Sequence, residues 1–251
     1  MKCLSLLRAP ALALAFAAGA ALAQGVELIP RASFFGNPTK AQGLISPDGR
    51  WISWIAPRDG VLNIWVAPAS DPSKAKALTE EKVRPIRQHF WARNSKLILF
   101  INDRGGDENF LLYGVDPNGG ALKSFTPFQK TRVIPIRDSL AHSDEILIGL
   151  NNRDARFHDV HRLNTVTGEL KLVYENHEFN EFTADDSLTV RIAKKEKAGG
   201  AAEVLRFDAG KTAPFGEIPA ADSITTNIIE DRKSTRLNSS HIQKSRMPSS
   251  A

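Results

Sequence analysis

The sequence of 251 residues predicts an all-β fold, an incomplete β-propeller of about four blades. Two observations lead to this prediction. Short runs rich in β-branched and aromatic residues alternate with turns rich in Asp, Asn, Gly and Pro. The runs also recur with a period in the forties, which is typical of propeller blades. A β-sandwich has short alternating strands too, but it does not predict units with matching turn positions.

The first 23 residues have the features of a signal peptide. Lys2 and Arg8 supply positive charge, residues 9–20 are apolar, and Ala21-Leu22-Ala23 is a small-x-small cleavage site. The apolar run is too short to span a membrane. Cys3, the only cysteine, lies inside this segment, so the mature chain contains none. We therefore expect an exported protein, periplasmic or secreted by a bacterium, that does not depend on disulfides.

Residues 24–40 are expected to form an N-terminal extension before the first blade, with one helical turn at Arg31–Phe35.

The net charge of the part that follows the signal peptide bears on its partners. The signal segment carries +2 and residues 231–251 carry +4 of the total of +5, which leaves −1 for residues 24–230. The basic balance therefore gives no reason to expect a nucleic-acid partner.

The first repeat unit is "LISPDGRWISWIAPRDGVLNIWVAP", which reads as strand, turn, strand, turn, strand. Ser46-Pro47-Asp48-Gly49 has turn chemistry, because Pro presets φ, Asp accepts from its own backbone and Gly permits positive φ. The runs at residues 51–56 and 62–67 have the composition of strands.

Equivalent strands recur along the chain. One set begins near Ile52, Leu97, Ile146 and Leu188, at separations of 45, 49 and 42 residues. The next set begins near Leu62, Phe110, His158 and Ala202, at separations of 48, 48 and 44 residues. A last strand follows near Lys76, Lys123, Lys171 and Phe215. The predicted partial propeller covers residues 41–230, with blades at about 41–82, 83–130, 131–176 and 177–219. Within 220–230, residues 221–229 are expected to form the first strand of a fifth blade.

The stretch "IPRASFFGNPTKAQGLISPDGRWISWIAPRDGVLNIWVAP" resembles the start of the propeller in bacterial peptidases of the prolyl oligopeptidase family, including dipeptidyl-peptidase and acylaminoacyl-peptidase-like members. Three later stretches agree, "NDRGGDENFLLYGVD", "NNRDARFHDVHRLNTVTGEL" and "FNEFTADDSLTVRIA". The resemblance covers about Ile29 to Ile229. SPDG alone is a weak signal, whereas the ordered set of four blade segments is considerably stronger.

The resemblance implies a propeller of seven or eight blades followed by an α/β-hydrolase domain with a Gly-x-Ser-x-Gly nucleophile and a Ser-His-Asp triad. It also implies that the parent enzyme cleaves peptides and that the propeller restricts the access of substrates to the catalytic serine. Gly-x-Ser-x-Gly does not occur in this sequence, so no catalytic residue can be assigned and the fragment alone is expected to be inactive. We assign no catalytic, cofactor-binding or metal-binding residue, and we expect no cofactor and no membrane contact after signal cleavage. The alternative is a non-enzymatic periplasmic propeller that serves as an interaction scaffold.

Two histidine-containing stretches are candidate metal sites. His158 and His161 lie three apart on a predicted strand and should point to opposite faces, so they cannot chelate one ion. The stretch His177–Glu181, "HEFNE", is not a His-Glu-x-x-His motif, and we interpret it as a turn between blades.

Three further features have an ordinary structural interpretation beside a functional one. Asp103, Asp107 and Glu108 do not have calcium-loop spacing and are interpreted as a hairpin turn. Arg153-Asp154 could place an Arg toward a peptide carboxylate or form a strand-end ion pair, and this choice stays open. The four tryptophans are expected to pack between blades; they are Trp51, Trp54, Trp65 and Trp91.

Residues 231–251 differ from the rest of the chain. They are basic, rich in serine and without apolar periodicity, which predicts a disordered tail. Their order, "DRKSTRLNSSH" and "SRMPSSA" on either side of Ile242-Gln243-Lys244, resembles the translation of a sequencing-adapter oligonucleotide with a variable index. We therefore expect this tail to be non-native and to interrupt the fifth blade.

Overall fold

The computed structural model describes residues 28–35, 39–208, 210–226, 228–229 and 241–242. The chain divides into two compact units, Met1–Pro38 and Thr39–Ala251. In the first unit the predicted helical turn is present as helix α2, Arg31–Phe35. The predicted signal peptide lies outside the described residues. Among the helices that the structure describes, none is long and apolar enough to cross a membrane.

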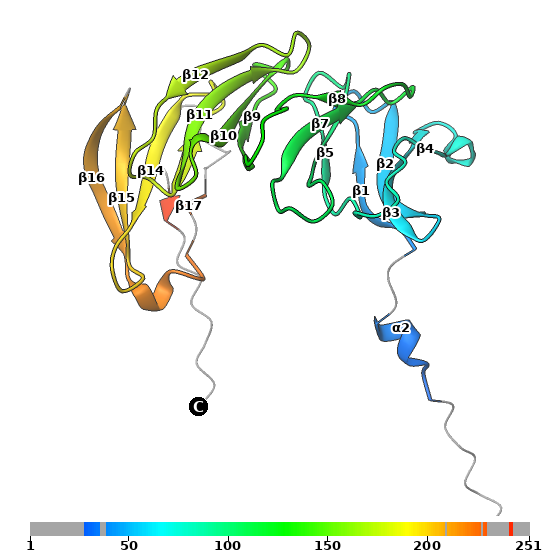
Figure 1. Cartoon of the computed structure of the whole chain (residues 1–251), viewed down its shortest axis with the longest axis horizontal. Helices are drawn as coiled ribbons and strands as arrows, with labels where there is room; N and C mark the ends of the chain where they lie inside the picture. Colours follow the sequence, from blue (N-terminus) through cyan, green and yellow to red (C-terminus); the bar gives the residue numbers. More distant parts are fainter. Residues whose placement is uncertain (1–27, 36–38, 209, 227, 230–240, 243–251) are drawn as a thin grey trace, which may run out of the picture. The chain divides into compact units, whose positions relative to one another are not determined.

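The second unit contains four antiparallel four-stranded sheets that follow one another in chain order, β1 to β4, β5 to β8, β9 to β12 and β13 to β16 (Figure 1). We call these sheets blades 1 to 4. In each blade the strands pair in chain order, so every connection is a hairpin. The strands are β1 Ala41–Ile45, β2 Trp51–Arg58, β3 Val61–Pro68, β4 Lys76–Ala77, β5 His89–Trp91, β6 Ile98–Asn102, β7 Leu111–Val115, β8 Lys123–Ser124, β9 Val133–Asp138, β10 Glu145–Asp154, β11 Phe157–Asn164, β12 Leu170–Tyr174, β13 Glu181–Ala184, β14 Val190–Glu196, β15 Ala202–Asp208 and β16 Lys211–Ile218.

The predicted repeat of strands and turns is confirmed in all four blades. Each predicted strand lies within a few residues of an observed one, and the all-β class is correct. The first turn of the repeat is stabilised as its composition suggests, because the Asp48 carboxylate accepts from the Ser46 hydroxyl at 2.6 Å and from the Arg50 amide at 3.1 Å. Gly49 has a φ of 72°, a left-handed conformation that favours glycine.

The predicted strand at residues 221–229 is wrong over most of its length. The short 3-10 helix η2, Ala220–Asp222, comes first, and only β17, Ile228–Ile229, is extended. The amide of Asp222 donates to the Pro219 carbonyl at 2.9 Å and that of Thr226 to the Asp222 carbonyl at 2.9 Å, so local bonds replace strand pairing here. In the predicted tail, β18, His241–Ile242, pairs with β17. The other tail residues lie outside the described part of the chain.

The hydrophobic core lies between consecutive blades, because alternate residues of each strand point to opposite faces. In β3, Ile64 and Val66 face blade 2 and pack with Ile98 and Phe100. Equivalent clusters join blade 2 to blade 3 and blade 3 to blade 4. Two-sided burial explains why the central strands read as apolar runs rather than as strict alternation.

A buried network of hydrogen bonds connects β3 of blade 1 to the segment that follows β4. The Asn63 side-chain amide donates to the carbonyls of Val61 at 3.1 Å and Glu81 at 3.0 Å. Its oxygen accepts from the Thr79 hydroxyl at 2.8 Å and from the Glu81 amide at 2.8 Å. All the hydrogen-bonding groups of this buried side chain are therefore paired, as a buried amide requires.

Blade 2 repeats part of this arrangement. The Thr126 hydroxyl accepts from the Leu112 amide at 2.9 Å, as the Thr79 hydroxyl does from the Ile64 amide at 2.9 Å. Both threonines stand three residues after a lysine, in the sequences KALT and KSFT. The sequence repeat thus reflects a repeated contact.

The first turns of consecutive blades are joined by hydrogen bonds. The Asp48 amide in blade 1 donates to the Ser95 hydroxyl in blade 2 at 3.0 Å. The Asn94 side-chain amide of blade 2 donates to the Asp144 carboxylate of blade 3 at 2.6 Å, and the Ser139 hydroxyl of blade 3 donates to the Asp186 carbonyl of blade 4 at 2.5 Å. These bonds fix the stacking register of the four blades on this side.

Candidate functional site

A groove of about 530 Å³ lies between blades 3 and 4. Its sides come from β9 and β13, which are the first strands of their blades and pair within the sheet only with β10 and β14 respectively. Its lining is part apolar and part polar, and it comprises Ile134, Pro135, Ile136, Arg137, Gly149, His158, Asn176, Asn180, Glu181, Phe182, Thr183, Ala184 and Ile228. Strand edges on both sides give the groove unpaired backbone groups that an extended chain could meet.

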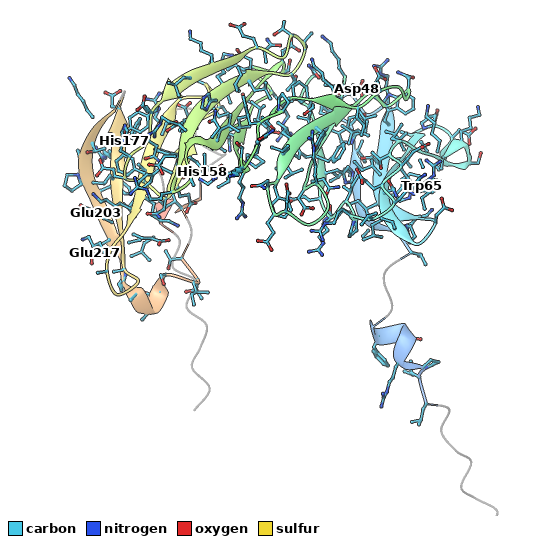
Figure 2. The ribbon with its side chains drawn as sticks, viewed as in Figure 1. Asp48, Trp65, His158, His177, Glu203 and Glu217 are labelled. Carbon is cyan, nitrogen blue, oxygen red and sulfur yellow. The ribbon has the colours of Figure 1, made fainter. Side chains whose placement is uncertain are left out.

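His158 forms part of the groove from β11 (Figure 2). A Cβ atom at Gly149, on the neighbouring strand β10, would lie 3.0 Å from the His158 Cβ, so the glycine makes room for the imidazole. Burial lowers the pKa of His158, and the nearby Arg132 charge lowers it further. The imidazole is therefore neutral at physiological pH and adds a polar but uncharged surface.

The charged groups of the groove are already paired with protein groups. Arg137 donates to the Asp186 carboxylate at 2.6 Å, and Glu181 forms an ion pair with Lys194. The Asn176 amide donates to the Phe179 carbonyl at 2.8 Å. A groove of this kind can hold a ligand by shape, apolar contact and backbone hydrogen bonds.

The structure confirms that His158 and His161 point to opposite faces of blade 3. His158 shares a face with Val160, which packs against blade 4, whereas His161 lies opposite Ile148, which packs against blade 2. His161 Nδ1 is 3.1 Å from the Asp159 carbonyl oxygen. Among the described residues no group of three or more His, Cys, Asp or Glu side chains could hold a metal ion. His177 Nε2 lies 3.1 Å from Glu175 in the connection between blades 3 and 4.

The acidic residues of the loop after β6 turn toward the loop itself. The Asp103 carboxylate accepts from Arg84 Nε at 2.7 Å and from the Glu108 amide at 3.1 Å. Burial raises the pKa of Asp103, but the Arg84 bond and the amide outweigh burial, and the net pKa lies below its ordinary value. Asp107 accepts from the Asn109 amide at 3.0 Å. The turn interpretation of this loop therefore accounts for the carboxylates of Asp103 and Asp107.

Arg153 forms the ion pair that the sequence left as one of two alternatives. Its Nε and Nη2 donate to the two carboxylate oxygens of Asp159 at 2.8 and 2.7 Å, and Nη2 also donates to the Asn176 carbonyl at 2.5 Å. Asp159 has a side chain only 4% exposed, so this pair is more than a surface contact. Asp154 pairs instead with Arg156, whose side chain is 76% exposed.

The tryptophans pack on both sides of blade 1, three from blade 1 itself and Trp91 from blade 2. Trp91 and the partly buried Trp51 pack in the core between blades 1 and 2, as predicted. Trp54 and Trp65 pack together with Ala56 and Ala67 on the opposite face. For these two residues the described structure contains no neighbouring blade, and their packing between blades stays a prediction.

Sequence reasoning missed a buried Ser-His contact between blades 1 and 2. Ser53 Oγ is 2.9 Å from His89 Nε2, and Trp91 Nε1 donates to the same Oγ at 2.9 Å. His89 is 3% exposed and burial lowers its pKa to about 4. The pair is sealed from solvent, so we interpret it as a structural contact. The two residues stand 36 positions apart and no spacing rule connects them.

Two sequence relatives of this chain are named as peptidases. No family model matches the chain. Dipeptidyl aminopeptidase BIII from Pseudoxanthomonas mexicana is 42% identical over 205 residues, which are 81% of this chain and 30% of that protein. Dipeptidyl peptidase family member 6 from Caenorhabditis elegans is 29% identical over 189 residues, 71% of this chain and 25% of that protein. The chain thus spans less than a third of either relative.

Solved structures agree in fold. Prolyl oligopeptidase B from Galerina marginata has a TM-score of 0.54 at 7% identity, over 78% of this chain and 29% of that one. A prolyl endopeptidase has a TM-score of 0.50 at 14% identity, over 71% of this chain and 28% of that one. At such identities the likeness concerns the fold alone. Together with the sequence relatives, it shows that the chain is similar to the propeller segment of peptidases of the prolyl oligopeptidase family.

Proposed function

We propose that this chain is the access-controlling propeller segment of an exported serine peptidase. The observation that carries the proposal is the 42% identity to a dipeptidyl aminopeptidase over 205 residues, in a chain that folds as four successive blades. In the parent, peptide bonds would be hydrolysed through an acyl-enzyme by a Ser-His-Asp triad in a C-terminal α/β-hydrolase domain. The sequence of this chain contains no Gly-x-Ser-x-Gly, so the proposal gives it no catalytic step of its own.

In this function, the role of the chain would be to contact the peptide and to select it. The first strands β9 and β13 offer edge backbone groups, and the groove between them offers an apolar wall of Ile134, Ile136 and Phe182. An extended peptide can pair with a strand edge and place a side chain in such a groove. A folded protein cannot, because its backbone groups are already paired. Selection of extended substrates follows from this difference.

Two variants in blade 4 of the parent enzyme test the groove. Thr183→Arg places a long charged side chain in it from β13, and we expect a several-fold higher KM for peptides with little change for a minimal dipeptide substrate. Thr212→Arg makes the same change on the outermost strand β16 and should leave both values unchanged. Equal effects of the two variants would reject the selection role.

The assignment to a peptidase has its own test. The 251-residue chain should neither hydrolyse peptides nor react with a fluorophosphonate, whereas the parent should do both. Fluorophosphonate-sensitive peptidase activity in the purified chain would overturn the proposal. A parent with a complete propeller but no reactive serine would favour the scaffold alternative.

A further inference from the structure

The groove between blades 3 and 4 has a strand edge on each side, and the two edges differ. On β9, Pro135 lies in the middle of the strand and has no N–H to donate. The strand also bulges at the next residue, Ile136, since its pairing shifts there between Leu147 and Ile148 of β10. A proline and a bulge are features by which native edge strands avoid pairing with another chain. The edge of β9 is therefore unsuited to a further strand.

The edge of β13 has neither feature. The strand, Glu181–Ala184, contains no proline, and where its pairing with β14 is irregular the extra residue is Arg191 of β14. Within its sheet β13 pairs only with β14. The segment β17, whose Ile228 lines the same groove, pairs with β18 instead. Among the described residues, this edge of β13 thus has no partner strand, and an extended chain could pair with it.

The charges of the groove decide which side chain it can accept. Arg137 and Glu181, the charged residues of the described lining, each already form an ion pair with another residue of the chain. The imidazole of His158 is uncharged at physiological pH, because burial lowers its pKa. A charged side chain in the groove would lose water without gaining a partner. An apolar side chain would gain contacts with Ile134 and Phe182, so the groove favours an uncharged apolar group.

We propose that an extended peptide pairs its backbone with β13 alone and places one uncharged apolar side chain in the groove, against Ile134, Pro135 and Ile136 of β9. We call these three residues the β9 wall. In this arrangement β13 supplies hydrogen bonds and β9 supplies side chains. Peptides that bind as an added strand take affinity from main-chain bonds and specificity from pockets for alternate side chains. The inference rests on the proposed function only in taking a peptide as the ligand.

Peptide binding to the parent enzyme tests the apolar selectivity. The probes are fluorescein-labelled octapeptides of alanine and serine that carry one Phe, Lys or Glu at successive positions. A parent with a reactive serine is first blocked with a fluorophosphonate, so that the peptides stay intact. We expect one position at which Phe lowers the Kd about tenfold relative to Lys and to Glu. Equal Kd values for the three residues at every position would overturn the proposal.

A charge placed on the β9 wall should change this preference. Ile134 lines the groove and is 37% exposed, so Ile134→Asp adds a carboxylate that has no cation beside it from the peptide with Phe. We expect the Phe peptide to bind several-fold more weakly and the Lys peptide several-fold more tightly. Val173→Asp, on the outermost strand β12 of the same blade, is the matched control and should change neither Kd. Equal effects of the two variants, or no effect of Ile134→Asp, would count against the proposal.

Backbone pairing has a separate readout in the peptide. Each amide of the Phe peptide is methylated in turn, and methylation should weaken binding several-fold at alternate positions. The reason is that alternate N–H groups of an added strand point toward its partner strand. Binding that is indifferent to methylation at every position would show that the peptide does not pair as a strand.

Hydrogen exchange in the parent shows which strand is the partner. On addition of the Phe peptide, exchange should slow more at residues 181–184 of β13 than at residues 133–138 of β9. The opposite order would place the peptide on β9, and full protection of residues 181–184 without peptide would mean that another segment of the parent occupies the edge. Either result contradicts the proposal. These measurements record binding, so a parent without a reactive serine would refute the proposed function and leave this inference to the Kd values.

Discussion

At the scale of single residues, two neighbouring Arg-Asp pairs in blade 3 differ in what surrounds them. Asp159 is buried and accepts from Arg153 and from the Asn176 amide at 2.7 Å. Asp154 pairs with an exposed arginine, Arg156. A sequence can suggest that Arg153 forms an ion pair, but it cannot show which acid is the partner. That choice depends on the irregular pairing of β10 with β11 between Leu150 and Asp154.

Removal of Asp159 should therefore destabilise the chain much more than removal of Asp154. Asp159→Ala leaves Arg153 and a buried amide without their acceptor, and we expect a loss of about 2 kcal/mol in the free energy of unfolding. Asp154→Ala should cost clearly less, because solvent can replace the exposed partner. Urea unfolding of both variants at one protein concentration measures the difference. Similar losses would mean that the buried pair has no special role.

His89 predicts a dependence of stability on pH. Burial lowers its pKa to about 4 in the folded chain, whereas the unfolded chain has the ordinary value of 6.5. Between these values the unfolded state binds more protons, so stability should fall as the pH is lowered from 6.5 to 4, by at most about 3 kcal/mol.

The variant His89→Asn isolates this effect. It keeps a polar group near Ser53 but does not titrate, so the difference in stability between wild type and variant should shrink as the pH falls through this window. Urea midpoints at pH 7, 5.5 and 4.5 measure it. A constant difference across the three values would show that His89 is not responsible.

At the scale of elements, the sequence predicts the strands well because their signal is local. Turn residues and apolar runs repeat with the blade, and the second and third strands of every blade were located within a few residues. The strand expected at 221–229 failed because Pro219 and Asp222 favour a 3-10 turn, which no strand pattern excludes. The Ser53-His89 contact was missed because its two residues lie in different blades. The repeat spacing predicts where the strands lie but not which side chains meet between blades.

Gly114 in β7 leaves room for the side chains of Leu99 and Phe125. A Cβ atom there would lie 2.8 Å from Phe125 Cε2 and 3.1 Å from Leu99 Cδ2, both in the core between blades 2 and 3. Gly114→Ala should lower the free energy of unfolding by about 1–3 kcal/mol through overpacking. Gly43→Ala in β1 is the matched control, since nothing lies within 4 Å of its Cβ position. Equal urea midpoints for the two variants would contradict this packing.

At the scale of the whole molecule, some sheet surfaces and strand edges have no neighbouring blade among the described residues. The outermost strand β16 has eight residues, most of them exposed, and Ile45 on β1 is 69% exposed. Such edges favour association. We expect the isolated chain to be poorly folded or to associate, with a sedimentation coefficient that rises with concentration. A cooperative melt of a monomer would contradict this expectation.

The central claim is that the chain is a propeller segment of a serine peptidase, and the reading frame in its source DNA tests it most directly. The frame should be recovered from the source DNA across codon 230, its product expressed, and the product treated with a fluorophosphonate and mapped by mass spectrometry. We predict further blades, then a Gly-x-Ser-x-Gly whose serine is labelled, with loss of peptide hydrolysis on labelling. A frame that stops after its last blade, or a product without a labelled serine, would contradict the account.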